Sequence, residues 1–230
     1  MNRYIKFLFT LFFYLMMVKS AAQSLSNGPF IDNMPGAFVR TRPDINSIEG
    51  TPYLHDDFIV GEVYYGGEFI SGQVPLRLNL HLDELEFIED DVIKVYINPE
   101  LIDKVVIGDE VFICLSNPQF KTRKKGYVKM WNSGYPSVLT KMRTNCFEYR
   151  GTPISEKKPT QFVRDKDVHY LMKSEDDIVL ITTVQKLINV LEDHSEELSI
   201  FAEEENLSVS NGADVAKLLD YYHQLSAQDL

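Results

Sequence analysis

Leu76-Arg-Leu-Asn-Leu-His-Leu82 alternates strictly between leucine and a polar residue. Because successive side chains of a β-strand point to opposite faces, this pattern predicts a strand with one buried face and one solvated face. Beyond it the apolar positions shift by one residue, to Leu85 and Phe87. A turn or bulge at Asp83-Glu84 accounts for the shift, since one extra residue reverses the facing of everything after it.

On both sides of this stretch, short strand-like runs are separated by turn residues. They extend from about Val60 to Tyr149, with Gly66-Gly67, Asn98-Pro99 and Gly108-Asp109 between them. Turns this short leave no room for crossover helices, so the pattern predicts antiparallel hairpins. One more hairpin is expected around residues 174–177.

The hydrophobic period changes from two to 3.6 near residue 183. Apolar residues from Val184 to Leu191 share one helical face behind Thr183 as N-cap, and further helices are expected to open at Ser195 and behind Asn211. Helices this short must pack on each other or on the sheet. The predicted fold class is α+β: a mainly antiparallel sheet, roll-like or sandwich-like, followed by a small C-terminal cap of about three helices.

The N-terminus has the pattern of a secretory signal peptide. Arg3 and Lys6 precede a run of twelve residues dominated by Phe, Leu and Met, Phe7–Val18, and Ser20-Ala21-Ala22 supplies the small residues of a cleavage site. Twelve residues of helix span about 18 Å, short of the ~30 Å membrane core. We therefore expect export to the periplasm or the extracellular space, with no transmembrane segment after processing.

The expected organisation of the chain has four parts. They are a signal peptide at 1–22, an extended lead-in at 23–50, an antiparallel β domain at 51–182, and a helical cap at 183–230 packed on that domain.

Charge is unevenly distributed along the chain. The 34 acidic and 23 basic residues give a net charge of −11. Cleavage after Ala22 would leave 20 basic residues against 34 acidic ones, a net charge of −14. This acidity excludes a general nucleic-acid binder. Residues 121–173 differ from the rest of the mature chain, because this segment has a net charge of +9. They are expected either to pack beside the acidic flanks or to present a surface to anionic partners.

The chain has two cysteines, Cys114 and Cys146. An exported protein with an even number of cysteines can form a disulfide, and a bridge between neighbouring strands is one possibility. The other is that both are free thiols, since Cys114 lies in an apolar run where cysteine behaves as a small hydrophobic residue. Thiol catalysis is not predicted, because neither cysteine has a histidine nearby in the sequence.

Two groups of acidic residues are candidates for catalysis. Asp165, Asp167 and His169 share a face if their segment is extended, and Asp83-Glu84 begins an acidic cluster. Together they could serve a hydrolase that acts on carbohydrate or peptide through paired carboxylates, provided that they converge in one cleft. The alternative for each group is a solvated polar turn. The spacing matches no known zinc or calcium loop, so no metal or cofactor is predicted.

Two further groups are candidates for binding. The first comprises aromatic residues that could form a recognition surface or belong to the core: Tyr53, Tyr64, Tyr65, Trp131 and Tyr135. The second is a predicted hairpin tip that could bind anions or be a solvated turn, with Lys121, Arg123, Lys124 and Lys125.

Four segments carry a resemblance to known sequences. They resemble exported proteins of Bacteroidota without an assigned chemistry, and they are Gly50-Thr-Pro-Tyr-Leu-His-Asp-Asp-Phe58, Gly61-Glu-Val-Tyr64, Leu76–Phe87 and the ending Leu218-Leu-Asp-Tyr-Tyr222. The resemblance implies a cell-envelope setting and no catalytic residue. We therefore expect a non-catalytic binding or structural component of the cell envelope, whose partner is an envelope protein or an anionic surface. The alternative is the envelope-associated hydrolase.

Overall fold

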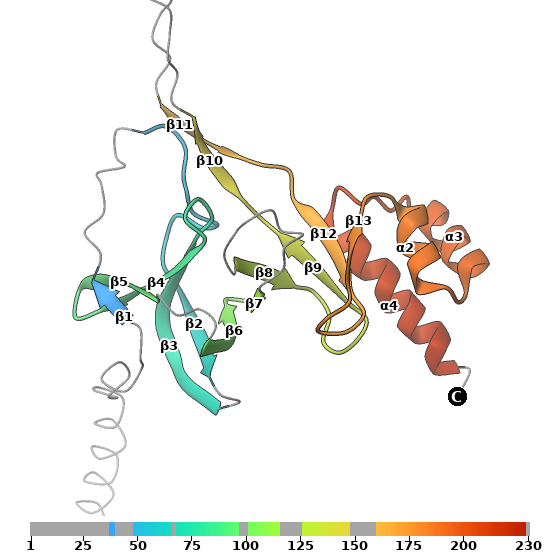
Figure 1. Ribbon diagram of the computed structural model, residues 1–230, viewed down its shortest axis with the longest axis horizontal. Helices are drawn as coiled ribbons and strands as arrows, with labels where there is room; N and C mark the ends of the chain where they lie inside the picture. The colour runs from blue at the N-terminus through green and yellow to red at the C-terminus, as the bar shows by residue number, and fades with distance from the viewer. Residues whose placement is uncertain are drawn as a thin grey trace, which may run out of the picture. The chain divides into compact units, whose positions relative to one another are not determined.

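The computed structural model describes residues 37–39, 48–65, 68–96, 101–115, 126–147 and 160–228 (Figure 1). All of these belong to one compact unit, Gly36–Leu230. The predicted signal peptide at 1–22 and most of the predicted lead-in at 23–50 lie outside the described residues.

The described strands form one large antiparallel sheet and one small one. The large sheet has eleven strands: β1 (Ala37–Val39), β2 (Ile59–Tyr65), β3 (Glu68–Asn79), β4 (Glu84–Glu89), β5 (Val92–Tyr96), β6 (Ile102–Ile107), β7 (Glu110–Leu115), β8 (Gly126–Met130), β9 (Ser137–Lys141), β12 (Val168–Met172) and β13 (Ile178–Ile181). Their order in the sheet is β1-β5-β4-β3-β2-β6-β7-β8-β9-β12-β13. Most strands therefore pair with the strand that precedes or follows them in the sequence. The small sheet pairs β10 (Thr144–Phe147) with β11 (Gln161–Arg164).

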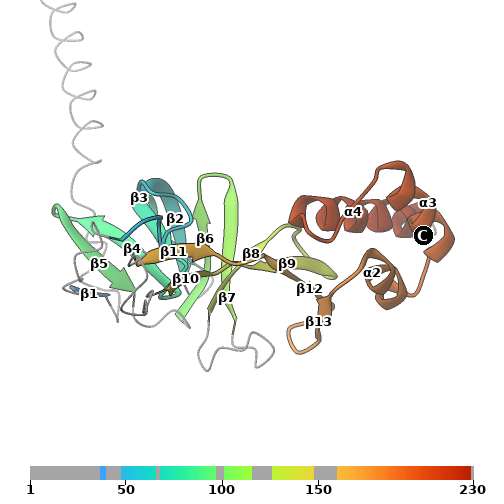
Figure 2. The same cartoon turned by 90° about the horizontal axis from the view of Figure 1, so that it is seen from above.

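Three helices follow the last strand (Figure 2): α2 (Val184–Leu191), α3 (Ser195–Glu204) and α4 (Gly212–Gln228). Thr183 caps the first, since its Oγ1 accepts a hydrogen bond from the Lys186 amide at 3.0 Å. Asn211 caps the third, accepting from the Ala213 amide at 3.1 Å. The second helix begins where expected, but His194 before it provides no side-chain cap. The predicted α+β class with a C-terminal helical cap is confirmed.

The leucine-rich stretch forms the last four residues of β3 and most of the turn after it. Its first two leucines face Phe87 and Leu85 across the ladder between β3 and β4, and all four side chains are buried. The turn occupies residues 80–83, and Asp83 adopts a left-handed backbone with φ of 59°. The predicted shift in the alternation of apolar residues therefore arises from a tight turn. Leu82, expected on the buried face, is exposed because it lies in this turn.

The opposite face of β3, expected to be solvated, is covered. Arg77 donates from Nη2 to Glu86 at 2.9 Å, and Asn79 donates to the same carboxylate at 3.3 Å. Glu86 is fully buried. The Arg77 guanidinium lies 3.6 Å from the ring centroid of Tyr53 and 4.2 Å from that of Phe58. The segment before β2 thus covers the polar face, with an ion pair and cation–π contacts compensating the burial of charge.

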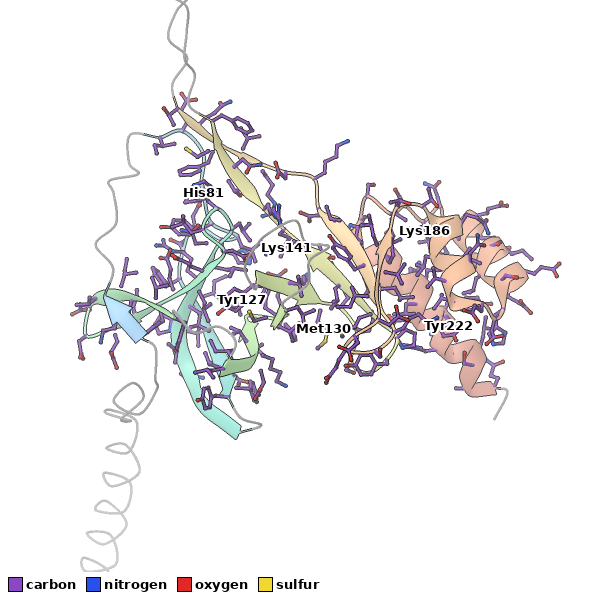
Figure 3. The ribbon with its side chains drawn as sticks, viewed as in Figure 1. His81, Tyr127, Met130, Lys141, Lys186 and Tyr222 are labelled. Atoms are coloured by element: carbon purple, nitrogen blue, oxygen red, sulfur yellow. The ribbon has the colours of Figure 1, made fainter. Side chains whose placement is uncertain are left out.

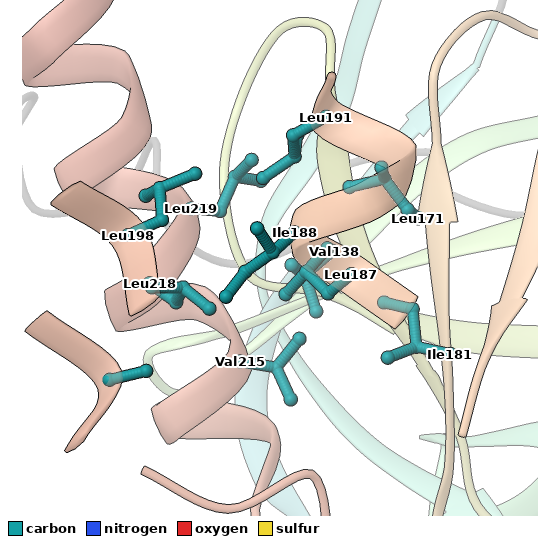
Figure 4. Packing of buried hydrophobic residues seen from close by; sticks show 11 residues of the cluster. Val138, Leu171, Ile181, Leu187, Ile188, Leu191, Leu198, Val215, Leu218 and Leu219 are labelled. Carbon is teal, nitrogen blue, oxygen red and sulfur yellow. The ribbon is translucent and has the colours of Figure 1, made fainter. Parts of the chain in front are cut away.

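The helical cap shares a hydrophobic core with the end of the sheet (Figure 4). Val138 of β9 and Leu171 of β12 pack against side chains from all three helices, among them Ile188, Leu198 and Leu219. These five side chains are at most 1% exposed. The cap is therefore held by apolar packing on β9 and β12, as short amphipathic helices require.

Replacing Leu198 by alanine should lower the free energy of unfolding by about 2–5 kcal/mol, because it would leave a cavity among the helices. Ile200→Ala, on the exposed side of the same helix, should change it by less than about 0.5 kcal/mol. Urea unfolding followed by circular dichroism measures both. Equal losses in the two variants would contradict the packing described.

Candidate functional site

A cavity of about 1050 Å³ lies at the end of the sheet next to the helical cap. Its walls come from β9, β12 and β13, from Arg164 at the end of β11 and residues 165–167 after it, and from Val209-Ser210 before α4. Four basic and two acidic side chains line it: Lys141, Arg143, Arg164, Lys166, Asp165 and Asp167. His169 and Tyr170 line it as well. A smaller hollow of about 400 Å³ between α2 and α3 has Glu203 as its single charged lining residue.

His169 is the most constrained polar residue of this cavity. It is 2% exposed, and its Nδ1 lies 2.8 Å from Oγ1 of Thr140 on the neighbouring strand β9. That oxygen also accepts a hydrogen bond from Nε1 of Trp131 at 2.7 Å. An indole nitrogen only donates, so the Thr140 oxygen accepts from Trp131 and keeps its own proton and a second lone pair for Nδ1 of His169.

Nδ1 of His169 therefore has a hydrogen-bond partner, Oγ1 of Thr140, in either neutral tautomer of the ring. Within the part of the chain that the structure describes, Nε2 is buried and has no hydrogen-bond partner. Burial lowers the pKa of His169, and the opposing charge of Asp167 does not cancel the effect. A pKa lowered from 6.5 favours the neutral ring near pH 7.

Trp131 is itself held by charged neighbours. The ammonium group of Lys129 lies 3.7 Å from the Trp131 ring centroid and bonds Glu110 at 2.7 Å. Partial burial raises the pKa of Glu110, but hydrogen bonds from Lys129 and His55 outweigh it and hold the pKa below its ordinary value. The chain of contacts from Glu110 through Trp131 fixes the hydroxyl that orients His169.

Lys141 contributes a buried positive charge to the cavity wall. Its Nζ lies 2.6 Å from Oδ2 of Asp83 and donates to the Tyr127 carbonyl at 2.9 Å (Figure 3). Oδ1 of Asp83 accepts from the Tyr127 amide at 3.0 Å. Burial lowers the pKa of Lys141, and the Asp83 carboxylate opposes this shift. A Cβ at Gly126 would lie 2.2 Å from Oδ2 of Asp83, so only glycine leaves room for this pair.

The acidic candidates converge only in part. Asp165 and Asp167 line the cavity with His169, although both precede β12 rather than lying on a strand. Asp165 accepts from the Asn145 amide at 2.8 and 2.7 Å, and Asp167 accepts from Arg164 at 3.0 Å. Asp83 and Glu84 are not lining residues of the cavity. Asp83 bonds the lining residue Lys141, and Glu84 begins β4. Among the described residues, no three acids, histidines or cysteines are placed to hold a metal ion.

The aromatic candidates do not form one surface. Tyr53 is buried against Arg77, whereas Tyr135 is 51% exposed in the loop before β9. Tyr64 and Tyr65 lie at the end of β2, where the pairing with β6 shifts register between them. Trp131 follows β8, three strand spacings or about 14 Å from β2. Trp131 belongs to the site through its hydrogen bond to Thr140.

Two other sequence predictions have different outcomes. The basic tip with Lys121, Arg123, Lys124 and Lys125 lies outside the described residues. The disulfide is not formed: Cys114 on β7 and Cys146 on β10 are both free thiols in different sheets.

Sequence reasoning missed Thr140, Lys141 and Arg143. The available signal is that Ser137–Lys141 is a short strand-like run in which polar residues flank apolar ones. In the structure this strand is buried at every position. A buried hydroxyl and a buried ammonium group need partners, so such a strand indicates a polar network.

No protein family model, curated protein or solved structure matches this chain. Among the helices of the described residues, none combines the length and apolar character needed to cross a membrane.

Neutralising Asp83 should destabilise the fold, because Lys141 would keep a buried charge without its counterion. We expect Asp83→Asn to cost about 3–5 kcal/mol in urea unfolding. Adding Lys141→Met should recover most of that loss, since it removes the unpaired charge. Asp176→Asn, at an exposed turn, is the control and should be neutral. A double variant no more stable than Asp83→Asn would show that the pair is not the cause.

Acid should destabilise the protein partly through His169. Because its pKa is lowered from 6.5 in the folded state, the unfolded chain binds a proton that the folded chain does not as pH falls below about 6.5. That contribution to stability is complete above pH 6.5 and is lost on acidification. His169→Asn should therefore lose less unfolding free energy than the wild type between pH 7.5 and pH 5. His81→Asn, at an exposed position, should behave like the wild type.

Proposed function

We propose that this protein is exported to the cell envelope and acts there as a non-catalytic binding component, with the His169 cavity as its binding site. The observation that carries the proposal is the cavity of about 1050 Å³, which four basic and two acidic side chains line together with apolar ones. Concave sites that combine apolar walls with a few converging charged groups are where proteins ordinarily bind ligands.

Export is supported by the sequence of residues 1–22, with its basic start, apolar run and small residues before the expected cut. The resemblance of Gly50–Phe58 and Leu76–Phe87 to exported proteins of Bacteroidota supports an envelope setting. A partner from the envelope, or an anionic surface, fits the basic side chains of the cavity wall.

The contacts of the acids favour binding over hydrolysis. A glycosidase needs one carboxyl group that delivers a proton and a second that attacks or activates water. Here donors from Asn145 and Arg164 occupy Asp165 and Asp167. The imidazole of His169 is bonded to a hydroxyl group through Nδ1, and no carboxylate is bonded to that nitrogen to stabilise a charged ring. The hydrolase therefore remains the weaker alternative.

Site-specific photo-crosslinking in the producing cell tests the proposal. A photoreactive residue at Val168, an exposed position on the cavity wall, should give an adduct in the envelope fraction. The same residue at Ile200, exposed on α3 and away from the cavity, is the matched control and should give none. Full-length chain retained in the cytoplasm, or equal labelling at both positions, would overturn the proposal.

Asp165→Asn and Asp167→Asn distinguish the alternative. In a binding component, the double variant should keep the Val168 adduct, because neither carboxylate performs chemistry. If the purified protein hydrolyses envelope glycan or peptide and the double variant loses that activity by about 10²-fold or more, the hydrolase is correct.

A further inference from the structure

We infer that the free edge of β13 binds an extended peptide segment of a partner protein, which adds to the large sheet as one more strand. This inference rests on the proposed function and names the class of ligand for the same site. The two are connected because the last two residues of β13, and Thr182 after them, line the His169 cavity.

β13 lies at one end of the large sheet. Within the part of the chain that the structure describes, it pairs with β12 and with no other strand. The Lys173 amide donates to the Asp177 carbonyl at 2.8 Å, directly before this ladder begins. Because hydrogen-bonded and non-hydrogen-bonded pairs alternate in an antiparallel ladder, Val179 directs its backbone groups toward β12 and Leu180 directs its own away from β12.

The hydrogen bonds on the other side of β12 lead to the same assignment. The Trp131 amide donates to the Val138 carbonyl at 3.0 Å, so Val138 faces β8 with its backbone groups and Leu139 faces β12. Leu139 is opposite Tyr170, and Tyr170 is opposite Leu180. Tyr170 therefore bonds β9, and the backbone groups of Leu180 point outward. Among the described residues, no other element forms a backbone hydrogen bond with Leu180.

The sequence of β13 does not protect this edge from pairing. Edge strands that stay unpaired usually carry a charge, a proline or a bulge. Ile178-Val-Leu-Ile181 has no charged residue and no proline, and its register with β12 is continuous. An apolar edge of this kind favours the addition of a strand, and its shortness limits the added segment to a few residues.

A peptide backbone matches this edge, whereas a sugar or a lipid does not. The outward-facing groups recur at every second residue, about 6.8 Å apart. Each of these residues presents one N–H donor and one C=O acceptor. Another extended backbone offers the complementary groups at the same spacing, and proteins bind peptides in this way at free sheet edges.

The cavity provides room for side chains of the added segment. Successive strand residues point to opposite faces, so a cavity lined by Leu180, Ile181 and Thr182 together extends around the end of the strand. Its wall also includes Val168 and Lys166, which are both exposed. Within the described residues Lys166 forms no ion pair. We therefore expect the segment to carry an apolar residue and an acidic residue that pairs with Lys166.

Photo-crosslinking from Val168 in the producing cell, combined with two variants of β13, tests the inference. Leu180→Pro removes the outward N–H group and keeps the bonds to β12, because proline is accepted where the N–H group faces away from the sheet. Leu180→Val keeps the N–H group and is the matched control. The Val168 adduct should fall about tenfold or more in Leu180→Pro and remain within about twofold of the wild type in Leu180→Val.

Amide hydrogen exchange detects the added strand in the wild-type backbone. In the free protein the Leu180 amide should exchange faster than the Ile181 amide, because only Ile181 bonds β12. In the purified Val168 adduct, exchange of the Leu180 amide should slow about tenfold or more. Lys166→Gln should reduce the yield of adduct, and Lys186→Gln on α2 is the matched control that should not.

The outcomes distinguish this inference from the proposed function. An adduct with a glycan, a lipid or a second copy of this chain would overturn the added strand of a partner. Equal yields in the two Leu180 variants, or an unprotected Leu180 amide in the adduct, would also overturn it and leave the proposed function standing. Absence of any Val168 adduct in the wild type would overturn both. Should Leu180→Pro fail to fold, hydrogen exchange of the wild-type adduct decides.

Discussion

Complete burial of β9 is the constraint on which the rest of the structure depends. All five of its residues are buried. Val138 belongs to the core shared with the helices, and Leu139 belongs to a second core with Val128 and Tyr170. A strand buried on both faces has no water to satisfy its polar side chains. Thr140 and Lys141 therefore need partners from other elements.

Those partners connect distant parts of the chain. Lys141 bonds Asp83 in the turn after β3, and Thr140 bonds both Trp131 after β8 and His169 on β12. The start of α4 packs closely against Trp131 and Thr140. A Cβ at Gly212 would lie 2.7 Å from the Trp131 ring and 2.9 Å from Oγ1 of Thr140. One polar network thus links the sheet, the cap and the cavity wall.

The charge pattern has a corresponding structural meaning. The basic stretch 121–173 is partly neutralised by the acidic flanks, through Lys141 with Asp83, Lys129 with Glu110 and Lys173 with Glu192. Arg143 and Lys166 of the same stretch are lining residues of the cavity. Packing beside the acidic flanks thus accounts for part of the basic stretch, and a surface for anionic partners stays a prediction.

Local pattern by itself determined the α+β class, the turn after β3, the helix starts at Thr183 and Asn211, and the buried leucines of β3, because period and capping depend on near neighbours in the chain. Alternation also suggested a solvated face on β3, which Tyr53 and Phe58 cover. Only the tertiary structure decided that coverage, the partners of Lys141, and the meeting of His169 with Thr140 and Trp131. These contacts join residues that are far apart in sequence, and no local period encodes which distant partner a buried polar group will find.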